Sequence, residues 1–503
     1  MLPRPTRRAR SRPPLDQAGR PLTRRGLLRA GMLGAGALAA PGALAACGSD
    51  PRRPVPSLEQ GSDVWRRFAG TTINFISENT APTAAIAANL KPFTDLTGIE
   101  VRIVNLELSA LVQRVALDMA SGEAQYHVVY ADPYQVLAPY SGGLADLREF
   151  VDDDTYPAVE GGLEDFIPTQ LQAAGTFGDD GAVYALPYDC PTMVWQYRQD
   201  LFDSYGEAMA DDLGFDPTPG GDRTWDEYRQ IAVWVNDNVD EVAYGAGQQA
   251  KQHDSLMCDF SNLLLAFGGD YFDGGEEIGL VGTTDPGECT LSSDAAVEAA
   301  AFYNDLVAVS HPAGRTWDWD GVGAALRAGE IAMCPNWHEF AASNEQTMPG
   351  QVAYAQLPRG PQRSAHMYGG TGIAISQNTD GAERGAAWLF VNWATSPQTQ
   401  LENLRSTAGG GTPTRSSVYQ LPEVLEAEQA PSELPNMLSG PAVRRAWEPE
   451  NIGLRPKIPM WNACDTAIFT ELSKMIAGQS SPQEAMTATT ERFDRIVDRG
   501  WVA

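Results

Sequence analysis

Two periodicities of apolar and polar positions alternate along most of the chain. Short β-branched and apolar runs predict strands at residues 71–76, 99–104 and 126–130 (TTINFI, IEVRIV and YHVVY). Amphipathic stretches at 84–97 and 108–121 predict helices between these strands. This alternation predicts an α/β body with mostly parallel sheets flanked by helices.

Polar residues that directly follow a predicted strand are the first candidates for a ligand site. Ligands of open α/β sheets bind beyond the carboxyl ends of the strands. Glu78 and Asn79 follow the first predicted strand, and Asp132 follows the third. The alternative for Asp132 is that its side chain caps the next helix.

The first 47 residues have the features of an export signal. Nine arginines and one aspartate precede residue 47, and an apolar run of 31–46 is shorter than the roughly 20 residues that span a bilayer. TRRGLLR at 23–29 resembles a twin-arginine signal. LAACG at 44–48 resembles a bacterial lipobox in which Cys47 is lipidated, the alternative being a chance cysteine in an apolar stretch. Residues 48–69 then form a flexible linker to the folded body.

Charge and cysteine content exclude some classes of protein. The chain has 36 Lys and Arg residues, of which 27 follow residue 47, and 65 Asp and Glu residues, of which 64 follow it. The chain after residue 47 therefore has a formal net charge of −37. Such a surface argues against nucleic-acid binding, which needs a basic face. The cysteines at 190, 258, 289, 334 and 464 match no zinc pattern. They are either buried thiols or include one or two disulfides whose pairing the sequence leaves open.

A series of motifs in a fixed order resembles one known family. The chain is similar to the extracellular solute-binding proteins of family 1, the maltose-binding-like receptors of ABC importers. The similarity covers roughly residues 70–500, with two departures: Ala185 replaces a usual glycine, and Asn336 precedes Trp337 where the family usually has proline. The segments that carry it are FTDLTGIEV (93–101), GLADL (143–147), VYALPYD (183–189), YRQDLF (197–202), TWDEY (224–228), FGGDYF (267–272), LRAGEIAM (326–333), GGTGIAIS (369–376), AWLFVNW (387–393), GTPTR (411–415) and SSPQEA (480–485).

The resemblance implies a two-lobed fold of the type II periplasmic-binding-protein class, with a hinge of crossover strands. Lobe 1 is expected to comprise residues 70–188 and 367–411, and lobe 2 residues 189–366 and 412–503. The ligand would bind in the cleft between the lobes and be passed to ABC permease subunits after the lobes close. A lipid-anchored monomer on the outer face of the cell membrane is expected. No cofactor, metal or catalytic residue is expected.

Position relative to the hinge selects further candidate ligand groups. Sugar binding needs aromatic faces and planar groups that bind vicinal hydroxyls. The family position favours Trp337, and the crossovers and neighbouring helices supply the rest: Tyr188, Asp189, Asp259, Asn262, Tyr368, Gly370, Thr371, Arg415 and Trp461. The alternatives are core packing for the aromatic residues and an interlobe salt bridge for Arg415.

Two rival functions stay open at this point. The sequence has no nucleophile elbow, no HExxH motif and no Walker A loop, although paired carboxylates could in principle hydrolyse glycosides. The predicted function is therefore binding of a mono- or oligosaccharide. A polyol, a glycerol phosphodiester, a peptide or a polyamine is the alternative ligand, and an extracellular hydrolase is the alternative class.

Overall fold

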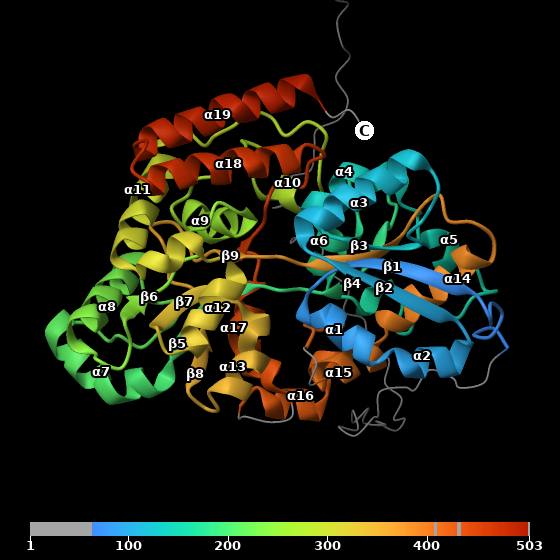
Figure 1. Cartoon of the computed structure of the whole chain (residues 1–503), viewed down its shortest axis with the longest axis horizontal. Coiled ribbons are helices and arrows are strands. Elements are labelled where there is room, and N and C mark those ends of the chain that lie inside the picture. Colours follow the sequence, from blue (N-terminus) through green and yellow to red (C-terminus); the bar gives the residue numbers. More distant parts are fainter. Residues whose placement is uncertain (1–62, 407–409, 430–433, 501–503) are drawn as a thin grey trace, which may run out of the picture. The chain divides into compact units, whose positions relative to one another are not determined.

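Two mixed sheets with helices on their faces form the body of the protein. The structure, a computed structural model, describes residues 63–406, 410–429 and 434–500, which all belong to one unit. The expected signal peptide, the lipidation site Cys47 and most of the expected linker lie outside the described residues. The sheets and their helices are drawn in Figure 1.

The first sheet has the strand order β2-β1-β3-β10-β4. Strand β1 pairs parallel with β2 and β3, whereas β10 pairs antiparallel with β3 and β4. Its strands are β1 (Thr72–Glu78), β2 (Glu100–Leu106), β3 (Val128–Ala131), β4 (Ala185–Asp189) and β10 (Thr371–Ile375). The helices of this part are α1 (Ala81–Ala88), α2 (Leu90–Thr97), α3 (Leu108–Ser121), α4 (Ala138–Tyr140), α5 (Arg148–Val151), α6 (Pro168–Gly175), α14 (Gly381–Ala394) and α15 (Pro397–Leu404).

Aromatic packing holds helix α14 against this sheet. The ring of Phe390 lies 5.6 Å from that of Phe75 on β1 and 5.5 Å from that of Phe93 on α2. Trp388 stacks on Phe150 at 5.1 Å. All five side chains are buried, so the sheet and its helices share one apolar core.

The second sheet has the order β6-β7-β5-β8. Its strands are β5 (Met193–Arg198), β6 (Tyr244–Ala246), β7 (Ile331–Trp337) and β8 (Val352–Ala355). The helices of this part are α7 (Gln199–Leu213), α8 (Trp225–Asn238), α9 (Asp254–Ala266), α10 (Glu276–Leu280), α11 (Asp294–Val309), α12 (Trp319–Arg327), α13 (Ala341–Thr347), α16 (Pro422–Ala427), α17 (Gly440–Ala446), α18 (Trp461–Ile476) and α19 (Pro482–Arg499). Two short strands, β9 (His366–Met367) and β11 (Ile452–Gly453), pair beside it.

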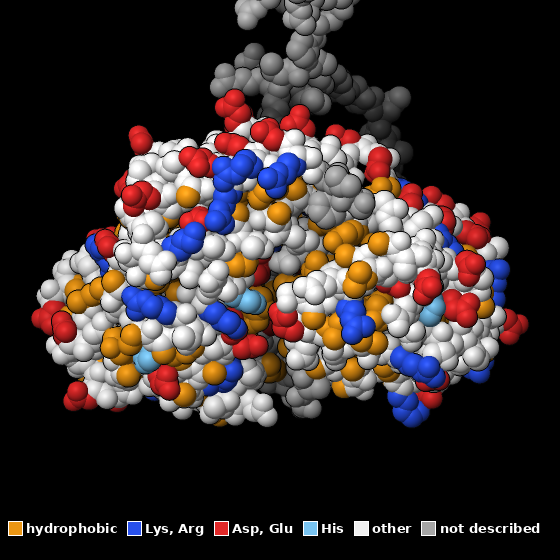
Figure 2. Space-filling view, turned by 45° about the horizontal axis from the view of Figure 1, so that its top comes forward, with side chains coloured by type: hydrophobic (Ala, Val, Ile, Leu, Met, Phe, Trp, Pro, Cys, Tyr) orange, Lys and Arg blue, Asp and Glu red, His pale blue; other side chains and the backbone are white. Residues whose placement is uncertain are grey.

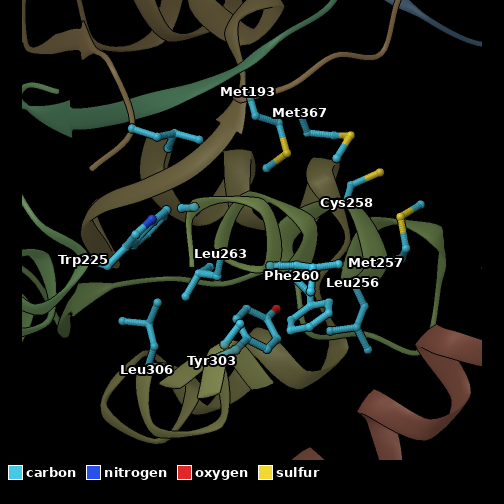
Figure 3. Close-up of a cluster of buried hydrophobic side chains, with 14 of the residues drawn as sticks. Met193, Trp225, Leu256, Met257, Cys258, Phe260, Leu263, Tyr303, Leu306 and Met367 are labelled. Carbon is cyan, nitrogen blue, oxygen red and sulfur yellow. The ribbon is translucent and has the colours of Figure 1, made fainter. Parts of the chain in front are cut away.

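Helix α9 is the centre of the second core. Every residue of α9 is buried, which is rare for a helix and requires neighbours on all sides. Figure 3 shows its Leu256, Phe260 and Leu263 between β5 residue Met193 and α11 residue Tyr303. Helices α18 and α19 lie side by side and α18 packs on α9, as Figure 1 shows at the upper left.

The structure confirms most of the expected elements and changes one of them. The predicted helix 84–97 is two helices, α1 and α2, broken at Asn89. Pro92 in the first turn of α2 lacks the N–H that a continuous helix would need there. The strands of each sheet mostly share one direction, as expected, and one strand in each, β10 and β5, runs antiparallel to its neighbours.

One local expectation from the sequence, a capping box, holds in the structure. Thr224 and Glu227 form a capping box at the start of α8. The five described cysteines form no disulfide, and four of them are buried. Among the helices of the described ranges, none has the length and apolar character that crossing a membrane requires.

Candidate functional site

Three segments lie side by side at the hinge. Two of them join the lobes, 190–192 between β4 and β5 and 368–370 between β9 and β10, and the third is 453–455, which begins at the last residue of β11. Tyr368 donates a backbone hydrogen bond to Gly453 O (2.9 Å), and Gly369 donates one to Pro191 O (2.8 Å). The structure thus has a hinge built from crossover strands, as expected.

Beside these crossings lies a cavity of about 240 Å³. It is lined by Glu78, Asn79, Thr80, Ala81, Leu108, Tyr130, Asp132, Asp189, Pro191, Asp254, Trp319, Asp320, Trp337, Glu339, Phe340, Ala342, Ser343, Gly369 and Arg455. The ends of β1, β3, β4 and β7 contribute to this lining, so strands of both sheets end at the same place. Figure 2 shows acidic and apolar side chains along the groove between the two lobes.

Five of the thirteen candidate ligand residues line this cavity: Glu78, Asn79, Asp132, Asp189 and Trp337. Trp337 is at the end of β7 and is 8 % exposed. Its ring lies against the hinge at Gly369, where a Cβ would come within 2.9 Å of the indole. A glycine at this position therefore allows the aromatic ring to approach the crossing strand.

Asp132 forms the helix cap that was the alternative considered for it, and it also lines the cavity. Its Oδ1 accepts hydrogen bonds from the backbone N–H groups of Tyr134 (2.9 Å) and Gln135 (2.7 Å), which caps the short helix η1 (Pro133–Leu137). Its Oδ2 lies 3.7 Å from the Arg455 guanidinium. Asp132 thus fixes the start of a helix and also faces the cavity.

Four further candidates lie directly behind cavity residues without lining the cavity. The Thr371 hydroxyl donates to the Tyr130 hydroxyl (3.1 Å), and the Tyr188 ring contacts the Tyr130 ring edge to face at 6.2 Å. Tyr368 is fully buried, and a Cβ on Gly370 would collide with its ring. The glycine at 370 makes room for the Tyr368 ring. The backbone at this position therefore comes close to a protein side chain and not to the cavity.

Asp259 and Asn262 lie on α9, inside the second lobe. Asp259 accepts hydrogen bonds from Gln249 N (3.0 Å) and the Tyr303 hydroxyl (3.1 Å), and burial raises the pKa of its carboxyl to about 7. Asn262 accepts a hydrogen bond from Met367 N (2.8 Å) in β9. Both residues support the elements behind Trp337 and the hinge.

Arg415 and Trp461 lie outside the cavity lining. Arg415 is fully buried; it donates to three backbone carbonyls and lies 3.7 Å from the Asp165 carboxylate. The fully buried Trp461 at the start of α18 contacts the Tyr271 ring edge to face at 5.2 Å. Arg415 thus forms a salt bridge and Trp461 packs in the core, which were the alternatives to ligand binding for these two residues.

Two carboxyls, the buried Asp189 and the partly buried Glu339, meet in the cavity from the two sheets. Asp189 ends β4, and Glu339 belongs to the short helix η5 (His338–Phe340) after β7. Burial raises the pKa of Asp189 to about 6 and, together with the charge of Asp189, raises the pKa of Glu339 well above its ordinary value. Glu339 carries the proton of the hydrogen bond between them, because two ionised carboxylates cannot share one.

A second charged group joins the lobes beside the hinge. Arg455 lies 3.7 Å from Asp132 and 3.7 Å from Asp254, at the start of α9, and its guanidinium lies over the Tyr134 ring at 4.2 Å. Gln135 also donates to Asp254 (3.0 Å). These contacts link the start of η1 in the first lobe to the start of α9 in the second.

The sequence reasoning missed several residues of the cavity. Glu339 stands two positions after Trp337, and Trp319 and Asp320 end an alternating aromatic and acidic run, WDWD at 317–320, so a local signal existed for them. Arg455 and Asp254 had no such signal, because only the meeting of the third hinge segment with α9 brings them to the cavity.

Comparison with known proteins gives the family. The sequence model described as "Bacterial extracellular solute-binding protein" matches residues 77–401, more than half of the chain. The chain belongs to the bacterial extracellular solute-binding proteins. The matched range begins at the end of β1 and includes the other strands of both sheets and the first two of the three hinge segments.

Related members of this solute-binding family include transport proteins of known or assigned ligands. The chain is 25% identical over 440 residues to a Sinorhizobium fredii protein named as a probable amino-acid ABC transporter periplasmic-binding protein (86% of this chain, 91% of that one). It is 26% identical over 429 residues to an erythritol/L-threitol-binding protein of Mycolicibacterium smegmatis (80% and 83%). A solved Agrobacterium radiobacter solute-binding protein in complex with ribitol has the same fold, at 24% identity and a TM-score of 0.70 (85% and 99%).

Proposed function

We propose that this solute-binding protein captures a small polyhydroxyl solute, a monosaccharide or a polyol, and delivers it to the permease of an ABC importer. The observation that carries the proposal is the cavity at the hinge, where aromatic rings and hydrogen-bonding carboxyl groups from both lobes surround one space. Aromatic faces pack on the C–H groups of such solutes, and carboxyl groups bind their hydroxyls.

The size of the cavity favours the small end of the expected ligand range. Its volume of about 240 Å³ is below the roughly 300–1,000 Å³ of pockets for drug-sized molecules. The relative named for erythritol and L-threitol and the fold neighbour bound to ribitol support a solute of this size. A monosaccharide or a polyol thus suits the site better than an oligosaccharide.

The geometry of the carboxyl groups argues against glycoside hydrolysis. Glycosidases hold two carboxyl groups about 5 Å or more apart, with the scissile bond between them. Asp189 and Glu339 are in direct hydrogen-bonding contact, which leaves no room for a sugar ring between them. We therefore expect the solute to be released unchanged.

A thermal-shift screen of the full chain tests the proposed function. We expect at least one monosaccharide or polyol to raise the unfolding temperature in a concentration-dependent way, because binding to the folded state stabilises it. Disaccharides and larger oligomers serve as the size control. If no polyhydroxyl compound shifts the transition, the proposal is wrong.

We also propose that Cys47 is lipidated and anchors the protein outside the cytoplasm. The lipobox-like LAACG segment and the basic residues before it carry this proposal. Mass spectrometry of the N-terminal peptide from membranes of a producing bacterium is expected to give a diacylglyceryl group on Cys47. An unmodified cysteine within an uncleaved N-terminus would contradict it.

A further inference from the structure

The cavity has many more acidic than basic groups. Six lining residues are acidic and one is basic: Glu78, Asp132, Asp189, Asp254, Asp320 and Glu339, against Arg455. Arg455 is already paired with Asp132 and Asp254. Asp320 is exposed, so the excess within the cavity rests on Glu78, Asp189 and Glu339.

Among the described residues, no cationic side chain lies beside these three carboxyls. In the described ranges, no Lys, Arg or His nitrogen within 4.0 Å of their oxygens is recorded, whereas such contacts are recorded for the carboxylates that Arg455 joins. The Oε1 atom of Glu339 is buried and has no hydrogen-bond partner. The hydrogen bond of Glu339 in the cavity is to the Asp189 carboxyl. Asp189 is buried and Glu78 and Glu339 are partly buried, so their ionised forms lack a counter-charge, and a bound cation would stabilise those ionised forms.

Aromatic rings line the same space. Tyr130, Trp319, Trp337 and Phe340 all contribute to the cavity. An ammonium group is attracted to the face of such rings, most strongly to tryptophan. Rings together with carboxylates form a surface that suits an organic cation with apolar C–H groups better than it suits a bare anion or a phosphate.

We propose that the solute is a polyhydroxyl compound with a protonated amine, such as an amino sugar or an amino polyol, whose ammonium group lies among Glu78, Asp189 and Glu339. This inference rests on the proposed function and narrows its ligand class. The hydroxyl groups would bind the remaining polar groups of the cavity, and the rings would pack against the carbon skeleton.

The protonation of the three carboxyls makes the affinity for an amine depend on pH. Burial raises the pKa of Glu78 to about 8 and that of Asp189 to about 6, and Glu339 holds its proton more tightly still. An ammonium group favours the ionised carboxylates, so binding expels protons into solvent, and affinity for the amine rises from pH 5 to pH 7. The other titratable groups around these carboxyls are Glu107, Tyr130, Asp132, Tyr188, Cys190, Asp254, His338, Tyr368, Tyr419 and Arg455.

Calorimetric titration of the full chain with matched pairs tests the proposal. The pairs are D-glucosamine and D-glucose, D-galactosamine and D-galactose, D-mannosamine and D-mannose, and D-glucamine and D-sorbitol. Each is titrated at pH 5, 6 and 7 in two buffers of different ionisation enthalpy, which reports proton release. We expect the best amine to bind at least about tenfold more tightly than its hydroxyl partner at pH 7, with release of protons.

Two variants test whether the carboxyls are responsible. Glu339→Gln is expected to reduce the amine-to-hydroxyl affinity ratio about tenfold. Glu298→Gln makes the same change on the exposed face of α11, outside the cavity lining, and is expected to leave that ratio unchanged. Thermal unfolding of both variants establishes that they fold.

The outcomes separate this inference from the proposed function. Equal or tighter binding of the hydroxyl partners, without proton release, would overturn the amine and leave the polyhydroxyl solute in place. Binding by neither member of any pair would overturn both. Binding of calcium chloride alone, with no amine or sugar bound, would assign the carboxyls to a metal ion and overturn the inference.

Discussion

Replacing Arg415 by methionine is expected to lower the free energy of unfolding by about 3–5 kcal/mol. The guanidinium is fully buried and donates to Thr395 O (2.9 Å), Glu160 O (2.9 Å) and Gly162 O (3.0 Å). It also lies 3.5 Å from the centre of the Phe166 ring. Methionine fills much of the volume but leaves these buried carbonyls without donors.

Urea denaturation followed by circular dichroism measures this loss. Arg405→Met is the matched control, because Arg405 is an exposed arginine near the end of α15 that pairs with Glu402 and Glu423 on the surface. We expect the control to change the free energy of unfolding by at most about 1 kcal/mol. An Arg415→Met protein as stable as the control would show that the buried contacts contribute little. A folded Arg415→Met protein that loses ligand binding would instead support the role of Arg415 as a ligand group.

Replacing Trp337 by alanine is expected to weaken solute binding about 30-fold or more. The indole lines the cavity at the end of β7 and rests on the hinge at Gly369. Its removal takes away the apolar face on which the carbon skeleton of the solute would pack, and it opens the site to water. Loss of one well-packed aromatic anchor commonly costs 2 kcal/mol or more.

Calorimetric titration with the best ligand of the thermal-shift screen measures this effect. Trp234→Ala is the matched control, because Trp234 on α8 is a similarly buried tryptophan of the second lobe that does not line the cavity. The control is expected to reduce stability while keeping the affinity. Equal affinity of the Trp337→Ala variant and the unaltered chain would remove Trp337 from the site.

Local sequence patterns were sufficient for much of the fold. The β-branched run before Glu78 becomes β1, and the amphipathic stretch 108–121 becomes α3 at the expected residues. The Thr224 capping box depends only on side chains three residues apart. Such features arise from contacts within a few residues, so the order of residues alone specifies them.

Features that depend on the meeting of distant strands were harder to predict. The sheets are mostly parallel as expected, but one strand in each, β10 and β5, is antiparallel, and its direction depends on the crossings and not on its own residues. The lobe boundaries expected at 188, 366 and 411 stay a prediction. The segment after 411 illustrates the difficulty, since Thr412 N donates to Asp189 and Thr414 donates to Pro187 O.

The sequence by itself determined the α/β class, the family resemblance, the residues at the ends of the first and third predicted strands, including Glu78 and Asp132, and Trp337 through its family position. These are properties of local periodicity and motif order. The tertiary structure decided which of these groups face one space. It placed Arg455 and Glu339 in the cavity and Arg415 and Trp461 outside its lining. The physical reason is that burial and counter-charge depend on segments far apart in the chain, which meet only at the hinge.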